Sequence, residues 1–541
     1  MKYIFVAVPL FFTTLSHAQT DPRKPAQPDP AKLQTVQKFD EVLTYISKLY
    51  VDDVDSKKLT DAAIIGMLEK LDPHSTYISR DEVEDANERI NGSFVGIGIR
   101  FQILKDTLMV VATIPGGPSE KLGIRAGDKI VKIEGQSVAG VGLKNTQVRE
   151  KLMGELGTKV RIEVQRKAIR KNMDYIITRD KIPVNSVDCY YMVTPETGYI
   201  KLNSFSRTTT EEVQAGIRSL KEQGMKNLIL DLQDNGGGLL YEAKNISDEF
   251  LSSNKLIVYS QGRAQPRSDL NAGTKGLWEA GKLAILTDEG TASASEIVSG
   301  AIQDWDRGLI VGRRSYGKGL VQRPIDLSDG SQMRLTIARY FTPSGRFIQK
   351  PYDDLEAYKN DYMDRYLHGE FTNQDSIKKF PDSLKFETKI KHRTVYGGGG
   401  IMPDIFVPLD TMEITEYYKG LIRGGHFNTY TLTYVDANRD EILAKYASFA
   451  KFNTQFVIDK KFMDEFFAYV KKEQPDLTFV EKDYKVSENL IKLRLKAMLA
   501  QDIWGANEFY QVYNVKNEIL QAAIKAVESK KYDEMGLDKT N

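Results

Sequence analysis

The sequence predicts a multidomain α/β protein with a helical segment near its N-terminal end and a helical region at its C-terminal end. Strand and helix patterns alternate between residues 198 and 312, which is typical of βαβ units around a mainly parallel sheet. Short strands separated by glycine turns fill residues 92–168, and charged segments of helical period begin at about residue 409. A chain of 541 residues is also too long for a single hydrophobic core.

The composition is that of ordinary soluble domains, with 41% hydrophobic and 28% charged residues. The 75 basic and 74 acidic residues leave a net charge of +1, so no field of one sign favours a nucleic-acid partner. Cys189 is the single cysteine, which excludes an intramolecular disulfide and a thiolate metal cluster. We interpret Cys189 as a small buried hydrophobe, and we expect neither a metal nor another cofactor.

Residues 1–18 predict a secretory signal peptide. Lys2 provides the positive charge, residues 4–15 are apolar, and the small residues Ser16 and Ala18 predict cleavage after Ala18. A retained membrane anchor is the alternative, but about a dozen apolar residues are fewer than the ~20 that span a bilayer. No cysteine follows for lipid attachment, and no later segment resembles a membrane span. We therefore expect a soluble protein exported to the periplasm or cell envelope.

A Pro-rich spacer at residues 19–32, with no expected regular structure, leads into an N-terminal helical segment at 33–91. Apolar residues at helical spacing predict one helix between Leu33 and Leu49, and a second is expected between Thr60 and Leu71. This pair is a small helical cap, an arm for association, as in a homo-oligomer, or a simple packing element, and the pattern does not choose among these.

Residues 92–168 predict a compact module of short strands with two helices. Turn residues bound the expected strands at 107–113, 129–134 and 160–164, a short helix after Pro118 and a helix at 146–153.

Residues 169–350 predict the α/β core. Its expected strands are 198–202, 228–232, 283–287 and 309–312, and its helices are 210–224, 239–253 and 295–304. A charged insertion is expected at 351–395, a return to the core at 396–408 and a helical C-terminal region at 409–541.

A glycine-rich loop, Gly236 to Gly238, follows the apolar strand at 228–232. Three glycines let the backbone approach a ligand and direct its N–H groups outward. A phosphate cradle is the rival interpretation, but the lysine and the serine or threonine of a P-loop are missing. A plain tight turn explains the segment equally well by itself.

Ser293 lies between the expected strand 283–287 and helix 295–304. A serine at a strand-to-helix switch suits a nucleophile, because the next N–H and the helix N-terminus can stabilise an oxyanion. Serine and threonine before a glutamate also predict a helix cap, and capping is the simpler interpretation of this segment alone. We expect Ser295 to be the cap, which leaves Ser293 free outside the helix.

A serine nucleophile needs a base. None of the histidines of the mature chain has a recognisable triad context; they are His74, His368, His392 and His426. Lys318 is the alternative, provided that burial lowers its pKa from ~10.4 towards ~7–8. Taken by itself, the glycine-flanked Lys318 is better explained as a surface loop residue.

Read together, residues 291–304 and 315–322 resemble the carboxy-terminal processing peptidases, also called tail-specific proteases. In that family the serine and lysine lie 25 positions apart and a glutamine follows the lysine by four, spacings that Ser293, Lys318 and Gln322 meet. The resemblance implies that these residues are the nucleophile, the general base and a glutamine that orients the lysine.

The resemblance extends over most of the chain. Residues 71–77 resemble the motif that closes the family's N-terminal helical segment, and 340–346 and 400–404 match segments of its core. Residues 92–168 look like its PDZ domain, with the carboxylate-binding loop at Val95, Gly96, Ile97 and Gly98. This implies a serine endopeptidase that recognises the C-terminal tails of protein substrates.

The implied mechanism is acyl transfer. Neutral Lys318 takes the proton of Ser293, and the N–H groups of Gly237 and Ala294 hold the oxyanion. Apolar tails are expected because Ile97 and Ile99 flank the PDZ groove.

The chain also departs from the family pattern. Gln233 stands where arginine is common, Gly236 stands where many members have proline, and 351–394 and the helical tail have no counterpart. Two rivals remain: a catalytically inert PDZ peptide-binding scaffold, and a different enzyme that acts on small ligands. The combined Ser293, Lys318 and Gln322 favour the protease.

Overall fold

The computed structural model describes residues 30–537 except 167, 168, 170, 253, 274, 378 and 379. The expected signal peptide and nearly all of the spacer at 19–32 lie outside these residues. Across the described residues, no helix combines the length and the apolar character that crossing a membrane requires. The chain forms two compact units, the first ending at Met67 and the second starting at Leu68.

The first unit contains α1 (Pro30–Leu49) and most of α2 (Ser56–Glu69). Both helices match the periodicity of the sequence. Helix α1 starts at Pro30, inside the expected spacer, because proline suits the first turn of a helix.

The first part of the second unit is the expected PDZ-like module. Its antiparallel sheet has the order β3 (Ile99–Leu104), β4 (Thr107–Thr113), β5 (Lys129–Ile133), β7 (Lys159–Gln165) and β8 (Met173–Thr178), with β6 (Gln136–Ser137) beside β5. Helices α4 (Pro118–Lys121) and α5 (Asn145–Leu152) accompany it. The module extends past residue 168, because β8 pairs with β7, and β9 (Asp180–Pro183) pairs with β2 (Ser93–Gly96).

The α/β core has a six-stranded sheet that is mainly parallel. Its order is β10 (Val187–Met192), β11 (Thr197–Leu202), β12 (Asn227–Asp231), β15 (Lys282–Thr287), β16 (Leu309–Gly312) and β21 (Ile405–Phe406). Only β10 runs antiparallel to its neighbour. The predicted fold class is confirmed.

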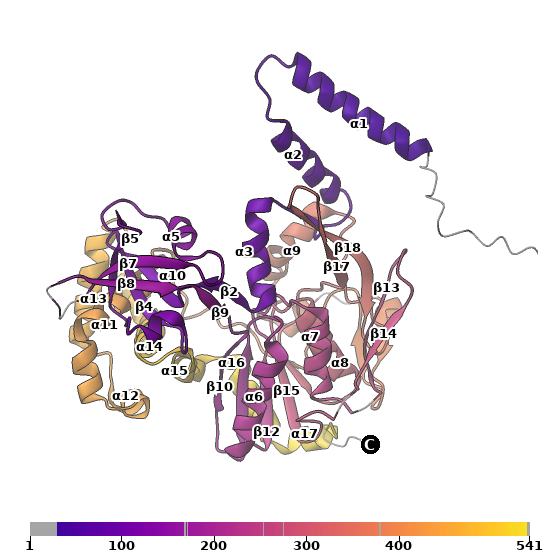
Figure 1. The fold of residues 1–541 in the computed structure, drawn as a ribbon. Helices are drawn as coiled ribbons and strands as arrows, with labels where there is room; N and C mark the ends of the chain where they lie inside the picture. Colours follow the sequence, from indigo (N-terminus) through magenta and orange to yellow (C-terminus); the bar gives the residue numbers. More distant parts are fainter. Residues whose placement is uncertain are drawn as a thin grey trace, which may run out of the picture. The chain divides into compact units, whose positions relative to one another are not determined.

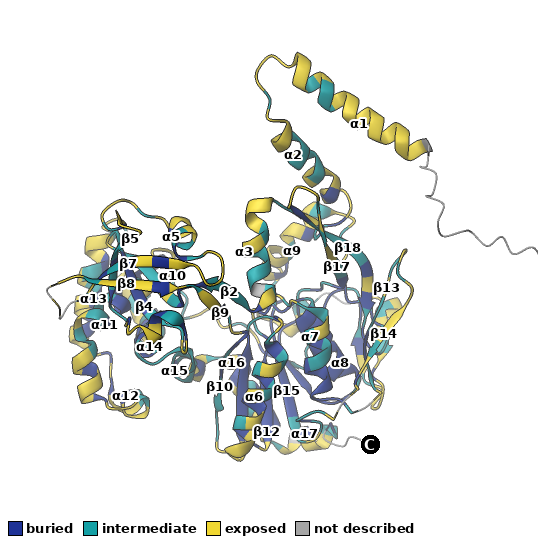
Figure 2. Cartoon of the chain, in the orientation of Figure 1, coloured by how far each residue is buried: buried dark blue, intermediate teal, exposed yellow. Residues whose placement is uncertain are grey.

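Alternate residues of these strands enter two different cores, so the sheet is covered on both faces. One face packs against α6 (Thr209–Glu222), α7 (Leu240–Asp248) and α8 (Ala294–Asp304) (Figure 1). The other packs against α16 (Glu518–Val527) and, through Tyr532, α17 (Lys530–Met535). Figure 2 shows the central strands of this sheet, such as β12 and β15, buried along most of their length.

A second, antiparallel sheet was not predicted. It contains β1 (Thr76–Ile78), β18 (Gln332–Phe341), β13 (Leu256–Gln261) and β14 (Ser268–Asn271), with β17 (Leu320–Asp326) also paired to β18. Because β1 pairs with β18, the segment expected to be wholly helical contributes a strand to this sheet before α3 (Arg80–Asn91).

The insertion is ordered against the core. It contains α9 (Leu355–Leu367), two short 3₁₀ turns (Gln374–Ser376 and Asp382–Leu384), and the hairpin of β19 (Lys385–Glu387) and β20 (Thr394–Tyr396). Buried Arg314 of the core pairs with Glu370 at 2.7 Å, and Arg393 pairs with core residue Asp306 at 2.7 Å. These ion pairs hold both halves of the insertion on the core.

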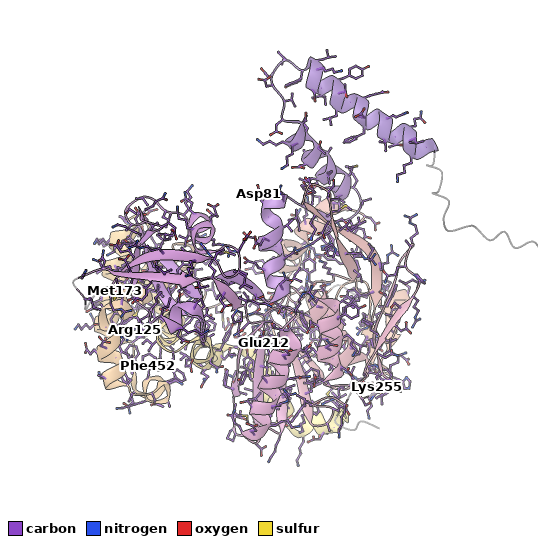
Figure 3. All side chains as sticks on the ribbon, viewed as in Figure 1. Asp81, Arg125, Met173, Glu212, Lys255 and Phe452 are labelled. Carbon is purple, nitrogen blue, oxygen red and sulfur yellow. The ribbon has the colours of Figure 1, made fainter. Side chains whose placement is uncertain are left out.

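The C-terminal region of 409–541 is helical, as expected, but it divides into two parts. Its first part has an aromatic core of its own, which includes Phe452 (Figure 3). This part contains α10 (Glu416–Arg423), α11 (His426–Lys445), α12 (Phe449–Gln455), α13 (Lys460–Glu473), α14 (Glu481–Ile503) and α15 (Ala506–Tyr513). The second part, α16 and α17, belongs to the α/β core.

Helix α11 packs against the PDZ-like module. Asn428 donates to Gln102 at 3.0 Å, and Leu432 packs with Met109 and Val111. A cavity of about 340 Å³ between them is bordered on the module's side by Arg125 (Figure 3).

Candidate active site

Ser293 lies in the short connection between β15 and α8. It is the N-cap residue of α8, and its backbone has a positive φ of 57° with ψ of −113°. A positive φ is uncommon and costly for a residue with a side chain, and such strain concentrates at functional sites.

The expectation that Ser295 caps α8 is wrong. Ser295 is the second residue of the helix, and its hydroxyl donates to the Asn235 carbonyl at 2.9 Å. Ser293 occupies the cap position itself, and its N–H donates to Glu296 at 2.8 Å. The Glu296 side chain therefore caps the backbone of Ser293, which lies two residues before the expected cap.

One cleft of about 590 Å³ contains all the residues that the sequence analysis assigned to catalysis: Ser293, Lys318, Gln322, Gly237 and Ala294. Its other walls come from α3, the β17–β18 hairpin and the glycine loop, and include Asn87, Ile90, Asn91, Leu320, Arg334 and Tyr340. The tertiary structure thus brings the serine, lysine and glutamine into one solvent-connected space.

The Lys318 side chain is directed by Gln322. Lys318 Nζ donates to Gln322 Oε1 at 3.0 Å, and Gln322 Nε2 donates to the main-chain carbonyl of His74. Burial lowers the pKa of Lys318 below the ordinary lysine value, against the attraction of Glu296 and Asp72. The site therefore favours the neutral amine that a general base requires.

Glu296 joins the backbones of the serine and the lysine, a role that the sequence analysis missed. Its Oε2 accepts the N–H groups of Ser293 and Lys318, both at 2.8 Å. Its Oε1 accepts Ser315 Oγ at 2.5 Å and Gly317 N–H at 2.7 Å. Burial raises the pKa of Glu296, while these donors oppose the rise. The capping pattern revealed the glutamate but not the loop at 315–318 that it reaches.

Tyr340 forms a second junction between the same segments. Its hydroxyl oxygen lies 3.1 Å from the carbonyl oxygen of Ser293 and 2.6 Å from that of Lys318. The side chain is fully buried at the end of β18.

The glycine loop lies directly against the serine. A Cβ atom at Gly237, where φ is +95°, would be 2.8 Å from Ser293 Cβ and from Ala294 N. The Gly237 N–H donates to Asn235 Oδ1 at 2.9 Å. Ala294 is the first residue of α8, so its N–H has no acceptor within the helix.

Gln233 folds back on the strand that precedes it. Its Nε2 donates to Asp231 Oδ2 at 3.0 Å, and the buried Lys201 of β11 pairs with Asp231 Oδ1 at 3.2 Å. A lysine from the neighbouring strand therefore provides a cationic partner for Asp231 beside Gln233.

The expected carboxylate-binding loop borders a second, smaller cavity of about 240 Å³. Gly96, Ile97 and Gly98 line one side with Ile99, and Leu152 and Met153 line the other. Val95 does not line this cavity and pairs with Lys181 in the β2–β9 ladder. Ile97 is only 2% exposed and contributes to the core of the module.

The sequence matches four described families. Residues 196–355 match Peptidase family S41, and 109–166 match the PDZ domain. Residues 5–82 match the N-terminal domain of the activating protease CtpB, and 417–505 match a family of unknown function.

Several relatives are proteases. The carboxy-terminal-processing protease of Bartonella bacilliformis is 34% identical over 394 residues, which cover 72% of this chain and 88% of that protein. A probable CtpA-like serine protease of Staphylococcus aureus is 35% identical over 314 residues, covering 58% of this chain and 62% of that protein. Among solved structures, the photosystem II D1 C-terminal processing protease is 28% identical, with a TM-score of 0.35, and the match covers 70% of this chain and 89% of that one.

Proposed function

Because this chain belongs to the carboxy-terminal-processing proteases of peptidase family S41, we propose that it cleaves proteins with Ser293 as nucleophile and Lys318 as general base. One observation carries the proposal. The strained Ser293 and the partly buried Lys318 line the same cleft, with both backbones bound to one Glu296 carboxylate.

Each step moves a single proton through Lys318. Neutral Lys318 Nζ accepts the proton of Ser293 Oγ as this oxygen attacks the scissile carbonyl, and then passes it to the leaving amine. A water then loses a proton to Lys318 as it attacks the acyl-enzyme, and the proton returns to Ser293 Oγ. Gln322 Oε1 holds Nζ in place throughout.

The oxyanion is proposed to bind the N–H groups of Ala294 and Gly237. The start of α8 supports the role of Ala294, because helix-start donors lack partners within the helix. Gly237 N–H reaches a substrate only after it exchanges Asn235 Oδ1 for the oxyanion. Loss of one such donor typically costs ~10²–10³ in rate.

Substrates are proposed to be selected by their apolar C-terminal tails. A tail that adds as a strand beside β3 places its side chains between Ile99 and Leu152, and its carboxylate at the 95–98 loop. Export of the mature protein, after cleavage at Ala18, to the periplasm or cell envelope is part of the same proposal.

The test is cleavage of an unfolded protein with an apolar C-terminal tail. Ser293→Ala and Lys318→Ala are each expected to abolish turnover, and a fluorophosphonate probe is expected to label the wild type but not Ser293→Ala. Turnover by either variant would disprove the dyad. Tail binding without turnover by the wild type would instead support the inert scaffold.

The pH dependence gives a separate test. The lysine must be neutral, and burial lowers its pKa, so kcat/KM is expected to rise with pH to a plateau. The midpoint of this acid limb should lie below the ~10.4 of free lysine. A midpoint at that value would contradict a burial-lowered pKa of Lys318 in the working site.

A further inference from the structure

The first helix of the insertion places one tyrosine against the segment that anchors Gln322. Tyr358 of α9 is 5% exposed, and its hydroxyl oxygen lies 2.6 Å from His74 Nε2. The two rings meet edge to face, with centroids 5.6 Å apart. The main-chain carbonyl of the same histidine accepts Gln322 Nε2.

The turn that carries His74 is also fixed from its other side. Asp72 accepts the N–H groups of His74 and Ser75, each at 2.8 Å. Thr336 of β18 donates to the same carboxylate at 3.1 Å. The His74 carbonyl is therefore held by Asp72 through the main chain and by Tyr358 through the side chain.

The position of that carbonyl determines which end of the Gln322 amide faces the base. A glutamine amide has an acceptor at one end and donors at the other, and a carbonyl can only accept. With Nε2 bound to His74, Oε1 faces Lys318 Nζ. A reversed amide would present N–H groups to the lone pair that must take the serine proton.

We propose that Tyr358 of the insertion is a positioning residue for the general base and acts on Lys318 through His74 and Gln322. This inference rests on the proposed Ser-Lys mechanism. It gives the insertion, which otherwise interrupts the core, a role in the reaction.

The charges around this contact are consistent with a neutral histidine. Burial lowers the pKa of His74 to about 4, and nearby Lys318 and Lys350 add to the effect against Asp72. His74 is thus uncharged near neutral pH, and the tautomer of its ring decides whether Nε2 donates to the Tyr358 hydroxyl or accepts from it.

Other groups also face Tyr358. Lys350 Nζ lies 4.3 Å from the Tyr358 ring centroid and pairs with Asp361 at 2.8 Å. The Tyr316 ring meets the Tyr358 ring edge to face at 6.3 Å. Glu296, Asp72 and Arg334 are the charges that act on Lys318 itself.

The first test is Tyr358→Phe, which removes only the hydroxyl. Loss of one positioning hydrogen bond is expected to lower kcat about 3- to 10-fold with KM nearly unchanged. The acid limb of the kcat/KM profile is expected to move to lower pH, because the lysine ammonium loses a well-held acceptor. An unchanged kcat and profile would overturn the inference.

Tyr362→Phe is the matched control. Tyr362 lies one turn later on α9, is 53% exposed and packs on Phe371, with centroids 5.2 Å apart. It should behave as the wild type in activity and pH profile. An equal loss in Tyr358→Phe and Tyr362→Phe would show that α9 acts only as general support and would overturn the assignment.

A double-mutant cycle tests whether Tyr358 acts through His74. In a His74→Ala background, Tyr358→Phe should cause no further loss. The same fractional loss in both backgrounds would overturn the proposed route and indicate another partner, such as Tyr316.

Failure of the wild type to cleave in a Ser293-dependent way would refute the proposed function. If cleavage depends on Ser293 but Tyr358→Phe leaves kcat and the pH profile unchanged, only this inference is refuted.

Discussion

At the scale of single residues, Glu296 is the group that keeps the serine and lysine segments together. One buried carboxylate accepts four donors from two loops that follow neighbouring parallel strands, β15 and β16. Because the carboxyl ends of parallel strands lie at one edge of a sheet, a side chain at the start of α8 can reach the loop after β16. The geometry of the proposed Ser293–Lys318 pair thus depends on a third residue.

Glu296→Gln is expected to lower kcat/KM by about 10- to 150-fold and to reduce the melting temperature. The amide leaves one of the buried donors facing an NH₂ group, and a hydrogen bond to a charged group contributes about 1.5–3 kcal/mol. Glu289→Gln is the control, because that carboxylate lies in the loop before α8 and pairs with the side chain of Arg313 after β16, rather than with the backbone of Ser293 or Lys318. Activity within twofold of the wild type would contradict the role of Glu296.

Gly237→Ala is expected to abolish most activity, because its Cβ would lie 2.8 Å from the Ala292 carbonyl oxygen and from Ala294 N. Its positive φ adds strain for any residue with a side chain. Gly236→Ala has no atom within 4 Å of the added Cβ, so its melting temperature should stay near that of the wild type. Activity assays and thermal melts of both variants check this. Equal melting temperatures for the two variants would argue against close packing at Gly237.

At the scale of elements, α1 presents an apolar stripe to solvent. The side chains recur at helical spacing and are 44–75% exposed: Leu33, Val36, Phe39, Val42, Tyr45 and Leu49. Such a continuous stripe usually marks an association surface. This favours the association arm among the interpretations of the N-terminal helices.

We therefore expect the protein to self-associate through α1 and Phe39→Glu to weaken that association. A charge in the stripe would be desolvated on burial. Light scattering coupled to gel filtration measures the mass, with Gln37→Glu as the control, because Gln37 is exposed on the polar side of the same helix. A wild type that stays monomeric at micromolar concentration would refute this expectation.

At the scale of the whole molecule, the end of the chain completes the α/β core. Helix α16 covers the face of the sheet formed by Tyr199, Ile229 and Leu286, which lie more than 200 residues earlier in the chain. The opposite face supports α8 and, through it, Ser293. The active site and the C-terminal helices therefore share one sheet.

Leu520→Asp is expected to destabilise the core by about 3 kcal/mol or more, because Leu520 is 1% exposed against that sheet. Val515→Asp, at a position 62% exposed, should change stability by less than about 0.5 kcal/mol. Denaturant unfolding compares the two. Similar unfolding free energies would mean that α16 adds little to the core.

The sequence predicted the elements whose pattern is local. Strand β4 and strand β16 have the expected bounds, because alternation and apolar runs report burial directly. The pairing of β1 with β18 and the packing of α16 on the sheet are long-range contacts, and no local sequence pattern predicts them. The capping pattern does not show whether Ser293 or Ser295 precedes the helix, and for this reason the expected cap at Ser295 is wrong.

The same division holds at the site. By itself, the sequence determined the fold class, the family resemblance and the spacing of Ser293, Lys318 and Gln322, because these depend on residue types and positions along the chain. Only the tertiary structure decided that Glu296 joins the two loops, that burial lowers the pKa of Lys318, and that His74 and Tyr358 lie behind Gln322. These features depend on contacts between segments up to hundreds of residues apart, and chain topology, rather than local pattern, creates such contacts.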